Sequence, residues 1–433
     1  MKHRIRLLTD EHGVALPMAM LALLILSALV VGFVVLSSSE PTIATNQLKV
    51  AQARSLAEAG VERAIWALKN PTIGIPATGA IPAPYNGTQF VPVSTGGYGV
   101  GGFRVTVAAA TTVPYPPECP AAASMSRADR CIVAVGWVPD ENARNAHQKI
   151  SVVVSNPQLL FTDPPAALSV RGDIQTGGNM AIDSRSDDSC GQKVGSVSTG
   201  STTRSVGSSD NVWGAGDDVP NQKTNANDGP IPSGAKDIVW KLAKSEFDKI
   251  ALSDADINAL RAYAKAHNGN GATYLQGPVA FSASNQMANG LVFVDTLSGK
   301  NITQEGVTPA TDPADFASVD INGNAAADPS GIFKGWIFAN GMLSIDGAFA
   351  MHGLAYAQND ISYHGVGTGG VFGAMISRNI LDTASTSIDS DLNGNASITY
   401  NCAYAKTGDN TIPNTWTITP KTYRELCDSL PCT

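Results

Sequence analysis

Three oxygen-bearing side chains late in the chain are spaced like the first half of a calcium-binding loop. Asp389, Asp391 and Asn393 alternate in a D-x-D-x-N pattern, and alternate oxygens of this kind converge on Ca²⁺ in such loops. The twelfth position is normally a bidentate Glu, but Tyr400 occupies it in this chain. The pattern therefore predicts either a weak calcium site or a polar turn, and the sequence suggests no other cofactor.

A glycine pattern just before this segment resembles a nucleotide-binding motif. Gly365, Gly367 and Gly370 spell GxGxxG, which cradles a pyrophosphate when it joins a strand to a helix within a βαβ unit. The residues that follow, VFGAMIS, favour a strand instead. We therefore predict turns at these glycines and no nucleotide site.

The remaining candidates for catalysis are isolated. His352 and His364 lie in no recognisable nucleophile motif, and the chain contains no GxSxG, HExxH or Walker sequence. We therefore expect no enzymatic activity. The alternative is a secreted carbohydrate-active β-helix enzyme in which Asp346 and Asp360 act.

Six cysteines point to disulfides. None forms a CxxC or a zinc-ligand spacing with His, and an even number fits an oxidising compartment. Six cysteines allow about 15 pairings, so the sequence leaves the pairing open. Short loops would be closed by Cys119 with Cys131, and by Cys402 with Cys427 or Cys432.

Composition limits the architecture and the partners. A chain of 433 residues exceeds the size at which single cores stop growing, so two or more folded units are expected. Only 15% of residues are charged and 42 are Gly, which suits turn-dense β structure. The net charge of -8 comes without a basic cluster beyond the first residues, so we expect no nucleic-acid partner.

The N-terminal region predicts a membrane helix. The run Val14–Leu36 carries no charge and, at about 1.5 Å per residue, would span about 34 Å. Lys2, Arg4 and Arg6 precede it, which predicts a cytoplasmic N-terminus with the rest of the chain outside. A cleaved signal peptide is the alternative, although its apolar core is normally about 7 to 15 residues long.

An amphipathic helix follows the apolar run. Its apolar stripe repeats every three or four residues, and Pro71 supplies the stop. Pro41 is expected to kink or interrupt the path between the two halves. The stripe consists of Val50, Ala53, Ala57, Val61, Ala64 and Leu68.

The segments EHGVALPMAMLALLIL and AQARSLAEAGVERAIWAL resemble the N-terminal region of type IV pilin-like proteins, above all PilX-type minor pilins. The resemblance covers about the first seventy residues. It implies a leader, residues 1–13, that prepilin peptidase removes between Gly13 and Val14, and a transmembrane helix, residues 14–36. It also implies filament packing through Met18, Leu23, Ala57, Val61 and Ala64. Major pilins carry Glu at the fifth mature position, where this chain has Met18, so the resemblance favours a minor or initiating role.

Beyond the helix the chain is mainly β. FRVTVA, CIVAVGWV and KISVVV predict three antiparallel strands, so residues 37–156 would form the amphipathic helix and a small pilin-like head. A proline-rich linker is predicted at 157–167, and a β-rich outer domain at 168–433 with a helical insertion at 237–266.

The outer domain contains a weak internal repeat. GWIFANGMLSIDG from Gly335 aligns without gaps on GLAYAQNDISYHG from Gly353, with further copies from Gly290 and Gly373. Periods near 20 residues favour stacked β coils, as in a solenoid. A plain antiparallel meander is the alternative.

These predictions define an α+β protein with a long N-terminal membrane and stalk helix, a small antiparallel sheet and a large β-solenoid-like domain. The function they favour is a minor subunit of a type IV pilus, at the tip or sparse in the filament, which primes assembly or adheres to surfaces. Its partners would be other pilin subunits, the inner-membrane assembly machinery, prepilin peptidase and a surface ligand. It would reside in the bacterial inner membrane and then in the extracellular filament. The alternative within the same architecture is a type II secretion pseudopilin.

Overall fold

The chain divides into two compact units. Unit 1 comprises Met1–Val107, Ile132–Val152 and Thr422–Thr433, and unit 2 comprises Ala108–Cys131 and Val153–Lys421. The computed structural model describes residues 15–76, 79–95, 98–143, 146–161, 164–204, 211–214, 237–302, 313–367, 369–381, 389–395 and 397–426.

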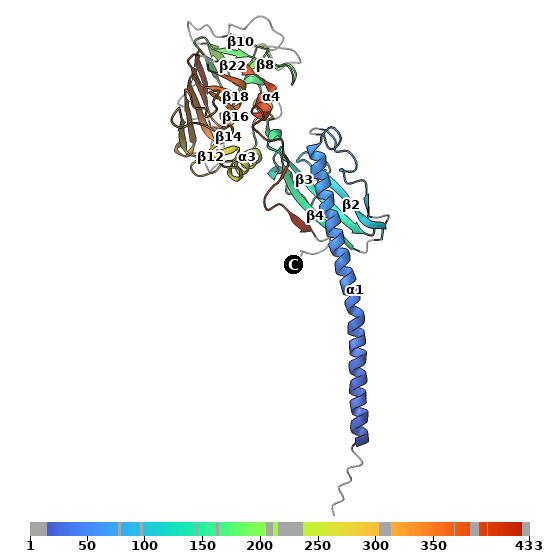
Figure 1. Ribbon diagram of the computed structural model, residues 1–433. Coiled ribbons are helices and arrows are strands. Elements are labelled where there is room, and N and C mark those ends of the chain that lie inside the picture. The colour runs from blue at the N-terminus through green and yellow to red at the C-terminus, as the bar shows by residue number, and fades with distance from the viewer. Residues whose placement is uncertain are drawn as a thin grey trace, which may run out of the picture. The chain divides into compact units, whose positions relative to one another are not determined.

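Unit 1 is built on one long helix, α1 (Ala15–Lys69), of 55 residues. At about 1.5 Å per residue it is about 83 Å long, and Figure 1 shows it as one continuous rod. The helix runs through Pro41, so the expected interruption there was wrong. Proline removes only one intrahelical hydrogen bond; the bonds on either side hold the helix together.

Sheet 1 packs on the second half of α1 (Figure 1). Its order is β1-β2-β3-β4-β23, with β24 also paired to β4, and the pairs β1–β2, β4–β23 and β4–β24 are antiparallel. The three predicted strands are its central strands β2, β3 and β4. The strands are β1 (Val91–Thr95), β2 (Tyr98–Ala108), β3 (Asp129–Val138), β4 (Ala146–Ser155), β23 (Thr417–Ile418) and β24 (Arg424–Leu426).

Two short C-terminal strands belong to sheet 1, and the segment Thr422–Thr433 is part of unit 1. β23 and β24 pair with β4, whereas the sequence placed the whole of 168–433 in the outer domain. Two short strands cover an edge that β4 would otherwise expose, and a covered edge resists unwanted pairing. Neither segment alternates long enough to signal this role in the sequence.

Unit 2 contains two parallel sheets. The first, sheet 2, consists of β5 (Ala166–Val170), β7 (Ala181–Asp183), β8 (Val194–Ser198), β10 (Asn211–Trp213), β11 (Ile238–Val239), β12 (Ala272–Gln276), β14 (Gly290–Asp295), β16 (Ile332–Ala339), β18 (Ala350–Ala357), β20 (Gly370–Ser377) and β22 (Ser397–Tyr400). The second, sheet 3, consists of β6 (Ile174–Thr176), β9 (Thr202–Arg204), β13 (Pro278–Phe281), β15 (Ala317–Asn322), β17 (Gly341–Gly347), β19 (Ile361–Gly365) and β21 (Ser390–Gly394).

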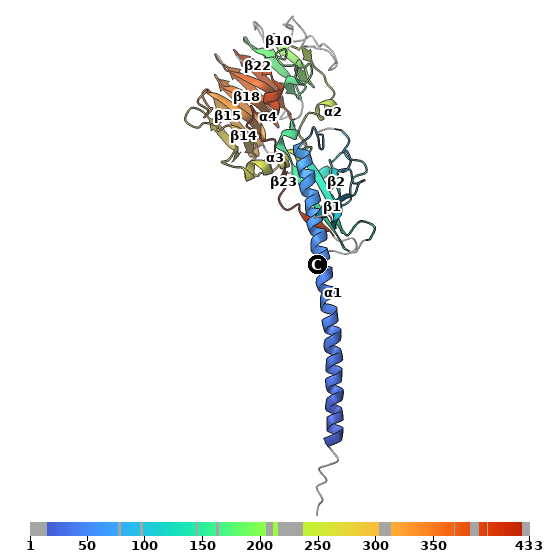
Figure 2. The same ribbon diagram turned by 45° about the vertical axis from the view of Figure 1, so that its right-hand side comes forward.

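From β12 to β22 successive strands alternate between the two sheets, so each pair of strands forms one coil. Figures 1 and 2 show these coils stacked, and Figure 1 labels β12 and β10 at opposite ends of the stack. The early strands β5, β6 and β7 pair with the late strands β20, β21 and β22. The chain therefore starts at one end of the stack, crosses to the other and winds back.

The register of the coils matches the repeat in the sequence. Gly335 pairs with Gly353, and Gly353 with Gly373. These three glycines have φ values of 145° to 154°, and a Cβ on each would collide with the carbonyl oxygen of the glycine in the preceding coil. The repeat needs glycine here because the backbones of adjacent coils approach closely at a positive φ.

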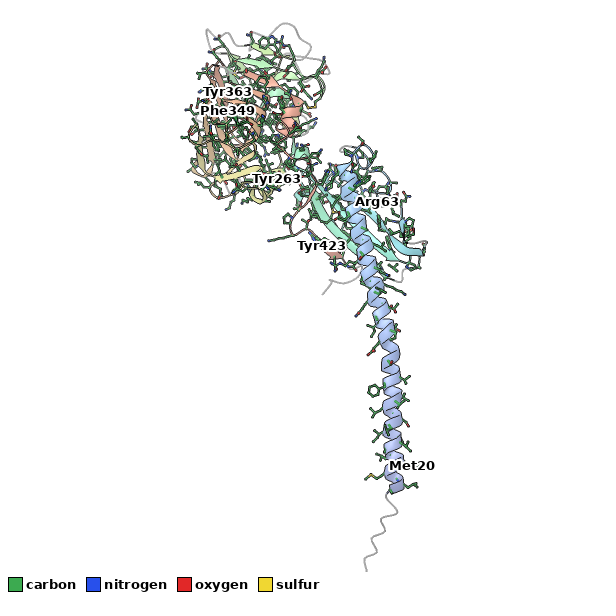
Figure 3. The ribbon with its side chains drawn as sticks, viewed as in Figure 1. Met20, Arg63, Tyr263, Phe349, Tyr363 and Tyr423 are labelled. Atoms are coloured by element: carbon green, nitrogen blue, oxygen red, sulfur yellow. A yellow bond between two sulfur atoms is a disulfide. The ribbon has the colours of Figure 1, made fainter. Side chains whose placement is uncertain are left out.

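One core fills the space between sheets 2 and 3, and it includes Phe349 and Tyr363 (Figure 3). A second core lies between sheet 2 and the helices α2 (Lys244–Phe247), α3 (Asp254–Ala266) and α4 (Cys402–Thr407). A capping box begins α3, because Ser253 and Asp256 bond reciprocally.

The described residues of the predicted linker, 157–167, pack within unit 2. The segment contains a 3-10 turn, Pro157–Leu160, and the beginning of β5. Leu160 and Phe161 are 1% and 4% exposed, and the ring of Phe161 meets Trp336 edge-on at 5.0 Å. The prolines signalled a break, but the apolar residues between them belong to the second core of unit 2.

Candidate anchoring helix and surface sites

The first part of α1 has an apolar surface that no described residue covers. Ala15–Val34 has a mean hydropathy of 2.5 and is entirely exposed. Met18 and Leu23, two of the predicted packing residues, are 68% and 64% exposed, and Figure 3 shows side chains projecting from the helix near Met20. By length and composition this segment can cross a membrane.

The second half of α1 buries its apolar stripe within unit 1 from Ala53 onward, whereas Val50 is 48% exposed. Ala57 and Ala64 are 0% exposed and Val61 is 5% exposed. The close approach uses Gly60, where a Cβ would lie 3.0 Å from the Phe103 ring. The chain's own sheet covers Ala57, Val61 and Ala64, for which the resemblance also implied filament packing. Of the five predicted packing residues, only Met18 and Leu23 remain accessible.

A charged network ties the C-terminal strand to the helix within unit 1. The Arg54 guanidinium lies 2.8 Å from Glu425 of β24 and 3.1 Å from Glu58. The Tyr423 hydroxyl donates to the same Glu58 carboxylate at 3.2 Å. Hydrogen bonding to Glu58 and Tyr423 raises the pKa of Arg54. Because these groups are half-exposed, the network specifies where β24 sits more than it adds stability.

Two disulfides lie in unit 2. Cys119 is bonded to Cys131, as the short loop suggested. Cys402 is bonded to Cys190, across 212 residues of sequence, instead of to a C-terminal cysteine. The sequence left the pairing of Cys402 open. Separation along the chain is a poor guide to proximity in a stack of coils: Cys190 follows β7, and β7 is the neighbour of β22.

Four of the predicted site residues lie outside the described residues. Gly13 and Val14, at the predicted leader cleavage site, immediately precede the described helix. Cys427 and Cys432 follow the last described residue, Leu426. These assignments stay predictions.

Each of the three calcium candidates contacts another residue in the structure. Asp389 accepts a hydrogen bond from the backbone N–H of Asp173 at 2.6 Å. Asp391 lies 3.1 Å from His364 Nε2, and Asn393 accepts from the N–H of Gly394 at 2.8 Å. Residues 390–394 form strand β21, not a loop or turn. In the described part of the chain, no three His, Cys, Asp or Glu side chains are grouped to hold a metal.

The two histidines lie on different sheets. His364 is on β19 of sheet 3, between Asp346 at 3.4 Å and Asp391 at 3.1 Å. His352 is on β18 of sheet 2, where its ring stacks on Tyr404 at 4.3 Å and meets Asp409 at 3.1 Å. They therefore cannot act together in one site.

His352 belongs to a row of side chains that runs straight across the outer face of sheet 2. Strand register aligns one residue from each of six neighbouring strands. All six side chains are at least partly exposed. We call this set the open row: Lys334, His352, Phe372, Thr399, Asp183 and Trp213.

Sequence reasoning missed the open row, although part of it has a signal. Lys334, His352 and Phe372 each precede the aligned glycine of a repeat copy. Reading the repeat by columns would have placed these three side chains side by side. Thr399, Asp183 and Trp213 lie outside the recognisable repeat, so only the fold adds them.

The charged members of the open row have partners. Lys334 lies 3.6 Å from Asp328, and Asp183 lies 2.7 Å from Arg185. Burial opposes ionisation of Asp183, but hydrogen bonds from Arg185 outweigh it and lower the pKa of Asp183. Arg185 also covers the Trp213 ring at 4.6 Å from its centroid.

Comparison with known proteins gives little guidance. No protein-family model matches the chain, and no curated protein matches it significantly. Among solved structures, an ice-binding protein from an Arctic yeast is 9% identical with a TM-score of 0.24, over 55% of this chain and 91% of that chain. The competence-associated pilin ComZ from Thermus thermophilus is 12% identical with a TM-score of 0.24, over 87% of this chain and 97% of that chain. Likenesses this weak carry no functional argument.

Proposed function

We propose that this chain is a minor pilin-like subunit of a type IV pilus, of the PilX type, and that its unit 2 is a β-solenoid displayed outside the cell. The observation that carries the proposal is the division of α1 into two halves. Ala15–Val34 is apolar and entirely exposed, whereas the stripe around Ala57 is buried against the chain's own sheet.

The exposed half needs another environment. Burying one large apolar side chain is worth about 1.5–3 kcal/mol, and this half exposes many, from Leu16 at 72% to Val34 at 63%. A membrane core and the centre of a helical filament both supply such an environment. The N-terminal resemblance to pilin-like chains favours both environments in succession. The chain would first reside in the inner membrane and would then be extracted into a filament.

The size of unit 2 favours a sparse position. It contains most of the chain, and a body this large at every subunit would crowd a thin filament. Met18 also favours a sparse position, because it replaces the Glu that major pilins carry at this position. Placing a carboxylate in the membrane costs about 2.5–3.5 kcal/mol. With Met18 the chain avoids this cost, but it also lacks any contact that the Glu carboxylate would make. The role would be assembly priming or surface adhesion at the tip, without catalysis.

Fractionation of the native host tests this proposal. Filaments sheared from the cells should contain the chain at far fewer copies than the major subunit. Leu23→Arg places a charge in the apolar half and should remove the chain from filaments, whereas Leu297→Arg, at a 56% exposed position in unit 2, should not. Absence of the wild-type chain from filaments would overturn the proposal. Loss of protein secretion on deletion, with pili intact, would instead identify a secretion pseudopilin.

A further inference from the structure

We propose that the open row on sheet 2 binds a neutral, extended polysaccharide, with Phe372 as its main contact. This inference rests on the proposed display of unit 2 outside the cell. It names the class of surface ligand that such a subunit would meet.

The open row is long, straight and narrow. It crosses six adjacent strands, and at about 4.8 Å between strands its five steps cover about 24 Å. α4 borders it on one side, where Tyr404 stacks on His352. On the other side the aligned residues are mostly small, and they include Ala350, Gly370, Ser397 and Ala181. A protein partner would normally bind a broad patch with an apolar centre. The open row is a narrow strip, so a linear polymer fits it better than a protein does.

The aromatic members suit sugar rings. Phe372 is 40% exposed, and the ring of His352 meets it edge-on at 5.5 Å. Three strand spacings separate Phe372 from Trp213, about 14 Å, but Arg185 covers one face of the Trp213 ring, so Phe372 supplies the main stacking surface. A pyranose has apolar C–H faces and hydroxyl edges, so it can lie on an aromatic ring while neighbouring side chains bond its hydroxyls. The Thr399 hydroxyl, in register between the two rings, is placed to do so.

The charges of the row favour a neutral ligand. Lys334, His352 and Asp183 face Asp328, Asp409 and Arg185, respectively. A charged polymer would have to compete with these partners, and no excess of one sign attracts it. Neutral hydroxyls can bond to the same groups without separating them.

The test uses the full-length chain in detergent. Retention would be measured on insoluble cellulose, chitin and starch, with alginate as an anionic polysaccharide and collagen as a protein surface. The variants are Phe372→Ala, Phe372→Tyr and Met342→Ala. Met342 is a matched control because it is 39% exposed, against 40% for Phe372, but lies on sheet 3.

At least one neutral polysaccharide should retain the wild-type chain. Phe372→Ala should weaken retention about tenfold or more, Phe372→Tyr should preserve it, and Met342→Ala should change it less than twofold. Circular dichroism would verify that each variant is folded. The proposal is overturned if no neutral polysaccharide retains the chain, if Phe372→Ala binds like the wild type, or if only alginate or collagen retains it. Retention that depends on Phe372 in a chain absent from filaments would sustain this site and refute the proposed pilus role.

Discussion

A buried ion pair between α3 and sheet 2 gives the sharpest test of how unit 2 is held together. Asp295 is 0% exposed and accepts two bonds from Arg261, at 2.6 and 3.0 Å. The Tyr274 hydroxyl, the Asn340 amide and the Thr296 N–H also donate to Asp295, at 2.9, 2.8 and 3.0 Å. Asp295→Ala would leave the Arg261 guanidinium, 10% exposed, without its carboxylate.

The expected cost follows from that burial. Removing one partner of a buried pair destabilises a protein by about 3–5 kcal/mol, because the remaining charge is uncompensated. Tyr274→Phe removes one hydrogen bond and should cost about 1 kcal/mol. For a unit of this size 1 kcal/mol corresponds to about 2 °C. The melting temperature should therefore fall by roughly 6–10 °C for Asp295→Ala and about 2 °C for Tyr274→Phe.

Scanning calorimetry of the full-length chain in detergent would measure these shifts. Asp320→Ala is a matched control, because Asp320 lies on the exposed face of β15; a surface change of this kind should alter stability by less than about 0.5 kcal/mol. If Asp295→Ala shifted the melting temperature no more than Asp320→Ala or Tyr274→Phe, the pair would not join α3 to the sheet as described.

The other predictions concern the metal candidate and the disulfides. Calcium at 1 mM should leave the melting temperature unchanged, because Asp391 lies in a strand against His364; a shift that Asp391→Ala abolishes would contradict this. Peptide mapping should link Cys190 to Cys402, and a peptide joining Cys402 to Cys427 or Cys432 would show that the pairing is wrong. Cys190→Ser should cost several kcal/mol, because this bridge closes a loop of 212 residues, for which the chain-entropy model gives about 5 kcal/mol.

Local patterns predicted the elements of this protein well. The apolar run and the amphipathic stripe predicted α1 because a helix is specified by residues three and four positions apart. The repeat predicted the register of β16 on β18 because Gly335 and Gly353 occupy equivalent, sterically demanding positions in successive coils. These signals are contained in short stretches of sequence or in their repetition.

The sequence did not predict the contacts between segments that are far apart in the chain. The strand Arg424–Leu426 is too short to show an alternation of apolar and polar residues. Its pairing with β4 depends on the path by which the C-terminal segment comes back to sheet 1. Cys190 and Cys402 are neighbours only because the early strands stack on the late ones. The open row was missed for the same reason, since Trp213 aligns with Phe372 only through the stacking of four strands.

The mature N-terminus tests the central claim most directly. If the chain is a pilin-like subunit, its leader is removed between Gly13 and Val14, and α1 keeps its apolar half. Mass spectrometry of the protein purified from the host membrane should then find Val14 as the first residue, and Gly13→Val should leave the full-length precursor. A mature protein that begins after Ser37 would lack the apolar half of α1, and it would contradict both membrane anchoring and a place in the filament.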